Sequence, residues 1–319
     1  MKQLFSILLV TLFSLTAGQE RYGQAEELKG TISISGAWAL YPMAVKWAEE
    51  FQKIHPLVKI DVAAGGAGKG MADTLAKIVD IGAVSRDVYP AEIAKGAWWV
   101  AVTKDAVVPT INQSNPFLKE ILTRGIKKES FIAIWVSGKI TNWKDAAGVT
   151  EPPSGMADIH VYTRSDACGA AEIWAKYLGV NQENLLGIGV YGDPGLAEAV
   201  RKDSLGIGFN NISYVYDPDT RKPVEGIQAL PIDLNGNARV DNDENFYSTR
   251  DEIMQAIITG KYPSPPARNL FFVCQGRPER PEVREFIRWV LTAGQEYVTS
   301  AGYVNLSAQA LQDELKKLE

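Results

Sequence analysis

Three short segments of the sequence combine glycine and other small residues where a strand-like run gives way to a helix-like run. They are Gly36–Leu40, Gly65–Gly70 and Arg164–Ala170. The first turn of a helix has backbone N–H groups without an intrahelical partner, and the helix dipole adds partial positive charge there. Such an end binds phosphate-like anions. The three segments therefore predict an anion-binding site made from helix N-termini.

Residues suited to catalysis are few. The chain has two histidines, of which His55 stands beside Pro56 at a predicted helix end and His160 lies in a predicted strand. No serine lies in a nucleophile elbow with a plausible histidine partner. The GGAGKG run at 65–70 lacks the Ser/Thr and the spacing of a P-loop, and it misses the dinucleotide fingerprint. We therefore expect no enzyme, since a hydrolase would need a catalytic base that the sequence does not offer.

Residues 233–244 form a loop rich in oxygen-bearing side chains. The residues at positions 1, 3, 5, 9 and 12 of this twelve-residue segment are Asp233, Asn235, Asn237, Asp241 and Glu244. With the backbone carbonyl of Arg239 at position 7, the spacing resembles an EF-hand type calcium loop. Ala238 stands at position 6, where that pattern needs a glycine with positive φ. The sequence therefore makes a structural calcium ion a candidate and requires no cofactor; an Asn/Asp-rich surface turn is the alternative.

The composition is that of an ordinary folded protein. The chain has 319 residues, of which 46% are hydrophobic and 22% charged, enough for one large or two medium cores. A net charge of −5 disfavours a nucleic-acid binder. Cys168 and Cys274 are too few for a disulfide framework or a four-cysteine zinc site, although a bridge between these two stays an alternative in an oxidising compartment.

The N-terminus resembles an export signal. Lys2 precedes the apolar-rich run Leu4–Leu15, which is followed by the small residues of 16–18. This order is typical of a signal peptide, and the run is shorter than the roughly 20 residues that span a bilayer. We expect residues 1–18 to be removed and the mature protein to be periplasmic or secreted. A membrane anchor or an amphipathic first helix is the alternative.

Strand-like and helix-like runs alternate along the mature chain. We expect strands at 31–34, 58–62, 81–84, 159–162, 205–209 and 270–273, and helices from 42 onward and at 71–78, 170–178, 195–202, 281–291, near 295–300 and at 308–318. This alternation predicts an α/β fold with a parallel sheet covered by helices. Two such halves with little catalytic machinery suggest that a ligand is captured in a cleft between two lobes.

Seven segments, in order, resemble the phosphate-type substrate-binding proteins of bacterial ABC importers. They are Ser35–Phe51, Gly65–Gly70, Val79–Arg86, Lys139–Trp143, Arg164–Glu172, Gly206–Phe209 and Lys261–Val273. The resemblance implies a two-lobe type II periplasmic-binding-protein fold with a hinge and an interlobe cleft. Lobe 1 would comprise residues 25–108 plus 267–319, and lobe 2 residues 109–266. It also implies a protein that binds a small oxyanion, most simply phosphate, and delivers it to a membrane ABC permease. We expect this protein to be a monomer.

The same resemblance assigns roles to individual residues. Arg164 would pair with the anion through bidentate hydrogen bonds, and Asp166 would hold that arginine, with a plain helix N-cap as the alternative. Ser85 would donate to the ligand and Arg86 would pair with its charge, or else lie as a solvated charge. Gly169 would let the backbone approach the ligand. The other predicted ligand contacts lie at the three junctions: Ala37, Trp38, Ala39, Leu40, Ala67, Gly68, Cys168 and Ala170.

Several of these positions depart from the family pattern. Small hydroxyl residues of the family are replaced at the junctions by Ala37, Trp38, Ala39, Ala67, Cys168 and Ala170. Each missing donor leaves a buried oxyanion oxygen unpaired, which costs on the order of 1–3 kcal/mol. The alternative function is therefore a fold-retaining binding, sensing or adhesion protein with a different ligand or no tight anion binding. Trp38 would then stack on an organic ligand or simply pack, and Cys168 could be an activated thiol or a buried side chain.

Overall fold

The computed structural model describes residues 27–150 and 157–319. The predicted signal peptide, residues 1–18, lies outside the described residues. Within the described part of the chain, no helix has the length and apolar character needed to cross a bilayer.

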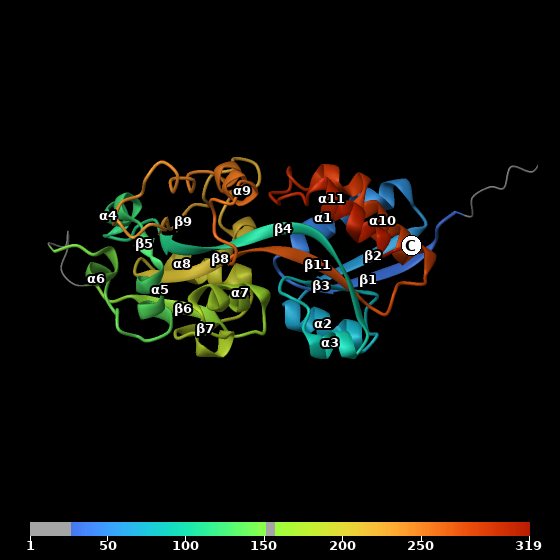
Figure 1. Cartoon of the computed structure of the whole chain (residues 1–319), viewed down its shortest axis with the longest axis horizontal. Coiled ribbons are helices and arrows are strands. Elements are labelled where there is room, and N and C mark those ends of the chain that lie inside the picture. The colour runs from blue at the N-terminus through green and yellow to red at the C-terminus, as the bar shows by residue number, and fades with distance from the viewer. Residues whose placement is uncertain (1–26, 151–156) are drawn as a thin grey trace, which may run out of the picture.

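The strands form one long mixed sheet that runs through the whole molecule (Figure 1). Its strand order is β2-β1-β3-β11-β4-β8-β6-β7, with β9 paired to β4, and a separate small sheet joins β10 to β5. The bounds are β1 Gly30–Gly36, β2 Val58–Ala64, β3 Ile81–Val84, β4 Ala97–Asn112, β5 Ile126–Lys127, β6 His160–Arg164, β7 Ile188–Val190, β8 Gly206–Asn211, β9 Ile227–Ala229, β10 Ile232–Asp233 and β11 Ala267–Gln275.

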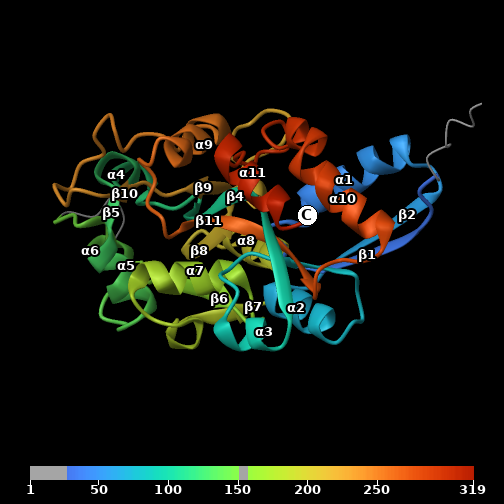
Figure 2. The same ribbon diagram turned by 45° about the vertical axis from the view of Figure 1, so that its right-hand side comes forward.

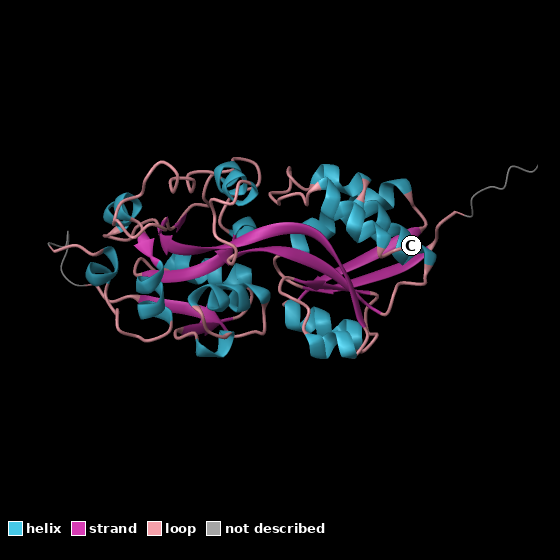
Figure 3. Ribbon diagram, in the orientation of Figure 1, coloured by secondary structure: helices cyan, strands magenta, loops and turns pink. Residues whose placement is uncertain are grey.

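Helices cover the sheet on both sides (Figure 3). The α-helices are α1 Tyr41–Ile54, α2 Ala67–Leu75, α3 Pro90–Ala94, α4 Leu118–Arg124, α5 Lys128–Trp135, α6 Trp143–Ala147, α7 Gly169–Leu178, α8 Asp193–Lys202, α9 Arg250–Ile258, α10 Pro281–Leu291 and α11 Ala308–Lys316. Short 3-10 helices are η1 Gln182–Asn184, η2 Ile212–Tyr214 and η3 Ala293–Tyr297. In α1, Met43, Trp47 and Phe51 recur every fourth residue and are fully buried, the pattern of an amphipathic helix on a sheet.

Two separate hydrophobic cores divide the molecule into two lobes. The first-lobe core draws on residues between Ile32 and Val102 and between Leu270 and Leu318. The second-lobe core draws on residues between Ala106 and Ala267, together with Val304. We use the names first lobe and second lobe for the elements packed around these cores.

Strands β4 and β11 connect the lobes. β4 pairs with β11 from Ala97 to Ala106 and then with β8 and β9 from Val107 to Asn112, so a single strand contributes to both cores. Two views that differ by a turn about the vertical axis both show β4 passing from one lobe to the other (Figure 1 and Figure 2). A strand shared in this way is the natural hinge between the lobes.

Most expected elements are present, with differences at their ends. The strand at 81–84 and the helix at 281–291 have the expected bounds. The helix expected at 71–78 instead spans Ala67–Leu75, because Gly66 at φ 92° precedes its start and Lys77 at φ 56° follows its end. The helix expected near 295–300 is the 3-10 turn Ala293–Tyr297. Pro231, which lacks the N–H that a continuous strand needs, separates β9, ending at Ala229, from β10, beginning at Ile232.

Candidate functional site

The three predicted junctions meet where the first lobe contacts the second. β1 and β3 are parallel neighbours, so the turns that follow them, with the turn after β2, lie at one edge of the sheet. Across this edge the backbone N–H of Gly68 in α2 donates to the carbonyl of Ala167, 3.1 Å away, just before α7. The starts of α2 and α7 therefore face each other from opposite lobes.

The contact between these junctions is tight. A Cβ placed on Gly68 would lie 3.0 Å from the Cβ of Ala167, and one on Gly66 would lie 2.9 Å from Oδ2 of Asp166. A Cβ on Gly169 would overlap both Oγ and the backbone of Ser85. The close approach of the lobes therefore leaves no room for a side chain at Gly169 and little at Gly68, while the φ of 92° at Gly66 also favours glycine there.

Arg164 lies fully buried at the end of β6 and is held by two carboxylates. Its Nε and Nη2 donate to the two oxygens of Asp166 at 2.8 and 2.7 Å, and its Nη1 donates to Oδ2 of Asp193 at 2.6 Å. Burial disfavours the charged form, but Asp193 first and Asp166 with it raise the pKa of Arg164 above its usual value. The guanidinium is permanently charged, and three of its five N–H groups donate to protein carboxylates.

A network of buried polar groups extends from the Arg164–Asp193 ion pair to the hinge strands. Asn211, at the end of β8, donates to Oδ1 of Asp193 at 2.6 Å and accepts from Arg268. Arg268 in β11 also donates to the carbonyl of Gly169 at 3.0 Å, and its Nε lies 3.1 Å from Oδ1 of Asp105 in β4. The network thus links both hinge strands to the start of α7. It contains two guanidiniums and three carboxylates: Arg164, Arg268, Asp105, Asp166 and Asp193.

Asp105 is the carboxylate of this network whose pKa is raised. Burial raises its pKa to about 6, with Arg268 opposing the shift and Asp193 adding to it. Sequence reasoning did not single out Asp105, Asp193, Asn211 or Arg268. The available signal was a charged residue beside an apolar strand run, which applies to Asp105 and Arg268.

Ser85 and Arg86 follow β3 but have different surroundings. Ser85 is buried beside Gly169 of the second lobe. Arg86 donates to both carboxylate oxygens of Glu92 at 2.9 and 2.7 Å and stacks 4.2 Å above the ring of Tyr89. Its guanidinium is thus engaged within the first lobe and is not the solvated charge that we considered as an alternative.

The first junction is apolar and packed. Its buried members are Ala37, Ala39 and Leu40. Trp38 makes an edge-on contact with Tyr191 of the second lobe, with 6.1 Å between ring centroids, and its carbonyl accepts from the hydroxyl of Tyr214 at 3.0 Å. Its Nε1 is buried without a hydrogen-bond partner among the described residues. Packing is therefore the role of Trp38 that these contacts support.

The remaining junction residues are buried small side chains. Ala67 and Ala170 are almost completely covered. Cys168 caps α7 by accepting from the N–H of Ala171 at 3.4 Å, and burial raises its pKa to about 12, so the activated-thiol alternative is wrong. Cys168 belongs to the second-lobe core and Cys274 to the first; both are free, so the bridge between them is not formed.

The 233–244 loop directs its oxygens mainly to its own backbone. Asp233 accepts from the N–H groups of Gly236 and Ala238 at 2.8 and 2.9 Å, and Glu244 accepts from Leu234 at 2.8 Å. The other residues expected as metal ligands, through side chains or, for Arg239, the backbone carbonyl, lie exposed or partly exposed on the loop: Asn235, Asn237, Arg239 and Asp241. In the residues that the structure describes, no group of three or more His, Cys, Asp or Glu side chains is arranged to hold a metal ion.

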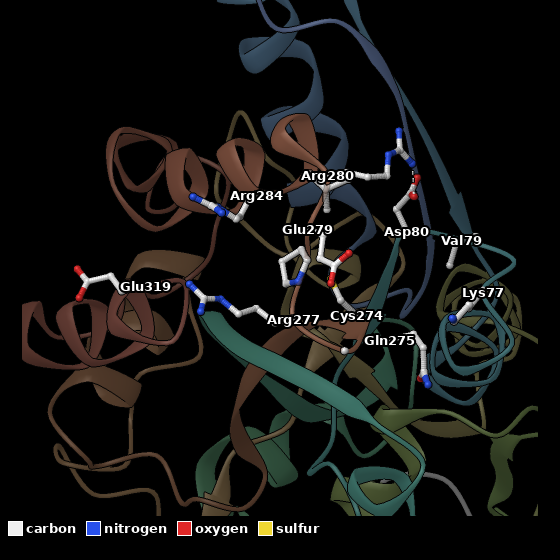
Figure 4. Close-up of a pocket in the computed structure, with 13 residues that line it drawn as sticks. Lys77, Val79, Asp80, Cys274, Gln275, Arg277, Glu279, Arg280, Arg284 and Glu319 are labelled. Carbon is white, nitrogen blue, oxygen red and sulfur yellow. Dashed lines mark hydrogen bonds and ion pairs between the residues drawn. The ribbon is translucent and has the colours of Figure 1, made fainter.

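Two surface pockets lie away from the interlobe contact. One of about 840 Å³ opens on the first lobe beside the start of α10, where Arg277, Arg280 and Arg284 alternate with acidic residues (Figure 4). A second, of about 580 Å³, adjoins it and shares Arg284. None of the residues that line these two pockets belongs to the predicted ligand set.

Comparison with known proteins gives one family and many relatives. A family model described as a PBP superfamily domain matches residues 22–293. The chain is 25% identical over 297 residues to Protein SphX of Synechococcus elongatus, covering 90% of this chain and 81% of that protein. It is also 25% identical over 365 residues to the phosphate-binding protein PstS of Methanocaldococcus jannaschii, with 93% and 88% covered.

Solved structures agree on the architecture. A phosphate ABC transporter substrate-binding protein from Clostridium perfringens superposes with a TM-score of 0.69 at 21% identity, covering 87% of this chain and 100% of that one. An ABC-type phosphate transport receptor from Vibrio cholerae gives a TM-score of 0.60 at 20% identity, with 86% and 100% covered. At this level of identity the likeness shows a shared fold.

Proposed function

Because the chain belongs to the PBP superfamily, we propose that it is an exported solute-binding protein that captures an oxyanion between its lobes. The two-lobe α/β fold and the family expected from the sequence are confirmed. Phosphate is the first candidate ligand, since relatives over most of the chain are named phosphate-binding proteins. The protein would present its ligand to a membrane ABC permease, act without catalysis and work outside the cytoplasm after loss of residues 1–18.

One observation carries the proposal: helix starts from opposite lobes converge beside Arg164 and Ser85. Gly68, at the start of α2, donates its N–H to the carbonyl of Ala167, two residues before α7. Both helix ends carry partial positive charge, and a shared anion would stabilise them together. We propose the ligand contacts to be Ser85, Arg164 and the backbone amides around 37–40, 67–68 and 168–170, with Asp166 as the support of Arg164.

Calorimetric titration with phosphate tests this function. We expect heat of binding from the wild type and from Arg201→Ala, a control that removes an exposed arginine of α8. The heat should vanish in Arg164→Ala. A milder variant, Ser85→Ala, should weaken binding about tenfold or more, because a donor to a buried charged oxygen contributes on the order of 1–3 kcal/mol. If no oxyanion releases heat with the folded wild type, the proposed function is wrong.

A second candidate is favoured by the surroundings of Arg164. Three of its five N–H donors serve Asp166 and Asp193, and the junctions offer alanines where the family has hydroxyls. The protein would then be a fold-retaining binding, sensing or adhesion protein with another ligand or no tight anion binding. The melting temperature in the presence of phosphate, sulfate or arsenate tests this candidate. An unchanged melting temperature, at concentrations that stabilise phosphate-binding relatives, would support it.

The lobe boundaries and the oligomeric state are also proposals. Residues 25–108 with 267–319 would form one lobe and residues 109–266 the other. The two separate cores support this division over most of its length, although Ala106, Val107, Val108, Ala267 and Val304 pack in the second core. We propose a monomer, because ligand capture needs only the two lobes of one chain. Light scattering after size-exclusion chromatography measures the mass directly.

Calcium at the 233–244 loop remains a hypothesis. Its support is the ligand spacing and the conformation of Ala238, whose φ of 59° provides the turn that the pattern usually assigns to glycine. The melting temperature, measured once with a chelator and once with excess calcium, tests whether the loop binds the ion. A bound ion predicts a lower melting temperature with the chelator; an equal temperature in both leaves the loop as a hydrogen-bonded turn.

A further inference from the structure

The lobes are joined by direct contacts well beyond the hinge strands. At the centre, the N–H of Gly68 donates to the carbonyl of Ala167 at 3.1 Å. Beside it, Gly169 packs so closely on Ser85 that a single added methyl group would overlap it. These atoms belong to the same junctions that would surround an anion, so the protein's own groups take up contacts there.

Polar side chains join the lobes along one rim. The loop after β3 supplies Asp87 and Tyr89, and α7 supplies Glu172 and Lys176. Lys176 Nζ lies 2.8 Å from Oδ2 of Asp87, and the hydroxyl of Tyr89 donates to Glu172. Burial and the hydrogen bond to Glu172 raise the pKa of Tyr89 well above its usual value, so the hydroxyl keeps its proton.

An aromatic contact joins the lobes at the first junction. Trp38 of the first lobe packs edge-on against Tyr191 and lies over Gly192, where a Cβ would come within 3.2 Å of the indole. The hydroxyl of Tyr214 donates to the Trp38 carbonyl at 3.0 Å. An edge-to-face pair of this kind is stabilising beyond the area that it buries.

We propose that these contacts form an interlobe latch that holds the lobes together without help from a ligand. The interlobe latch comprises Trp38, Gly68, Ser85, Asp87 and Tyr89 of the first lobe with Ala167, Gly169, Glu172, Lys176, Tyr191 and Tyr214 of the second. Its consequence for anion uptake rests on the proposed function, whereas the latch itself does not. If only unlatched molecules admit the ligand, the apparent dissociation constant rises by the inverse of their fraction.

Small-angle X-ray scattering of protein freed of phosphate by an enzymatic scavenger tests the latch. The wild type should have the small radius of gyration of closed lobes, and added phosphate should not reduce it. Gly169→Ala should increase the radius, because its methyl group can be accommodated only if Ser85 and the first lobe move away. Gly195→Ala, within the first turn of α8 in the second lobe, is the matched control and should match the wild type.

Two scattering results would overturn the proposal. One is a phosphate-free wild type whose radius of gyration equals that of Gly169→Ala. This result counts against the latch whether or not added phosphate then reduces the radius. The other is a Gly169→Ala radius equal to that of Gly195→Ala. Melting curves of both variants establish that they are folded. Because none of these comparisons requires phosphate binding, failure of the latch is distinguishable from failure of the proposed function, which calorimetry reports.

A second variant tests the rim without touching the tight glycine contacts. Lys176→Glu places a carboxylate against Asp87 and should enlarge the radius of gyration of the phosphate-free protein. Lys202→Glu, which makes the same change in an ion pair within α8, should not. Equal radii of gyration for these two variants would show that the rim contacts do not help to hold the lobes together.

Discussion

At the scale of single residues, the interlobe region is dominated by buried charge. Arg164 is completely covered and forms hydrogen bonds to Asp166 and Asp193. A buried ion pair gains little over a well-packed apolar pair, yet removal of one partner leaves an uncompensated charge. The residues of this network therefore influence stability as well as any ligand.

Replacement of Arg164 should be strongly destabilising. We expect Arg164→Ala to lower the free energy of unfolding by about 3–5 kcal/mol, because two buried carboxylates lose their cation. Arg201→Ala should change it by less than about 0.5 kcal/mol, as is usual for an exposed site. Urea unfolding at neutral pH measures both. Equal stability of the two variants would contradict the burial argument.

Asp105 should make stability fall with rising pH in the mildly acid range. Its folded pKa is about 6, while an unfolded aspartate has a pKa of about 3.9. Between these values the folded state binds more protons than the unfolded state, so this group's contribution decreases from about pH 4 to about pH 6 and is constant above. Urea unfolding across this range should show that slope in the wild type and its loss in Asp105→Asn.

The slope is the diagnostic quantity, because the amide also loses the ion pair with Arg268 and shifts stability at every pH. The same slope in both proteins would show that Asp105 is ionised throughout.

Residue-level prediction from sequence succeeded where the chain places partners close together. Arg164 and Asp166 are two residues apart, so a motif is enough to suggest their pairing. Asp193 and Arg268 reach the network only after three strands and the hinge have assembled. Their partners are distant in sequence, which is why local patterns did not identify them.

At the scale of elements, glycines determine how closely helix and sheet approach. Gly70 in α2 lies against β1 and β3, where a Cβ would be 2.6 Å from the carbonyl oxygen of Ala83 and 2.8 Å from Cα of Gly36. The glycine-rich segment that suggests an anion cradle therefore also allows α2 to pack directly on the strands.

Gly70→Ala should destabilise the first lobe in spite of the better helix propensity of alanine. We expect a loss of about 1–3 kcal/mol, since the methyl group meets rigid backbone rather than flexible side chains. Gly195→Ala, which meets only Cγ1 of Val190 at 3.2 Å, is the matched helical control. Thermal melting compares them; a Gly70→Ala protein as stable as the control would show that α2 can shift.

Strand β4 illustrates what sequence patterns miss. Its first part, within 97–102, is apolar and suggests a core element, but Lys104, Asp105 and Pro109 interrupt the pattern that follows. The strand continues because it exchanges partners from β11 to β8 and β9 at that point. Tertiary pairing therefore sustains a strand that local preference would end.

At the scale of the molecule, two cores share one sheet. Val100 and Val102 of β4 are buried in the first core, and Val107 and Val108 in the second. Unfolding of either lobe would leave part of β4 without partners. The lobes should therefore unfold together, as a single cooperative unit.

Scanning calorimetry of two core variants tests this coupling. Leu291→Ala truncates a buried side chain of the first lobe and Leu196→Ala one of the second. Each should cost about 2–5 kcal/mol and should move one undivided transition to lower temperature. Division of the transition into two peaks in either variant would mean that the lobes unfold independently.

The two thiols offer an internal reporter of these motions. Cys168 lies in one core and Cys274 in the other, both covered and with pKa values raised to about 12 by burial. An alkylating reagent attacks the thiolate, so each sulfur becomes reactive only when its surroundings open to solvent. Peptide mapping after a labelling pulse would therefore time the exposure of each half of the protein separately, with no engineered probe.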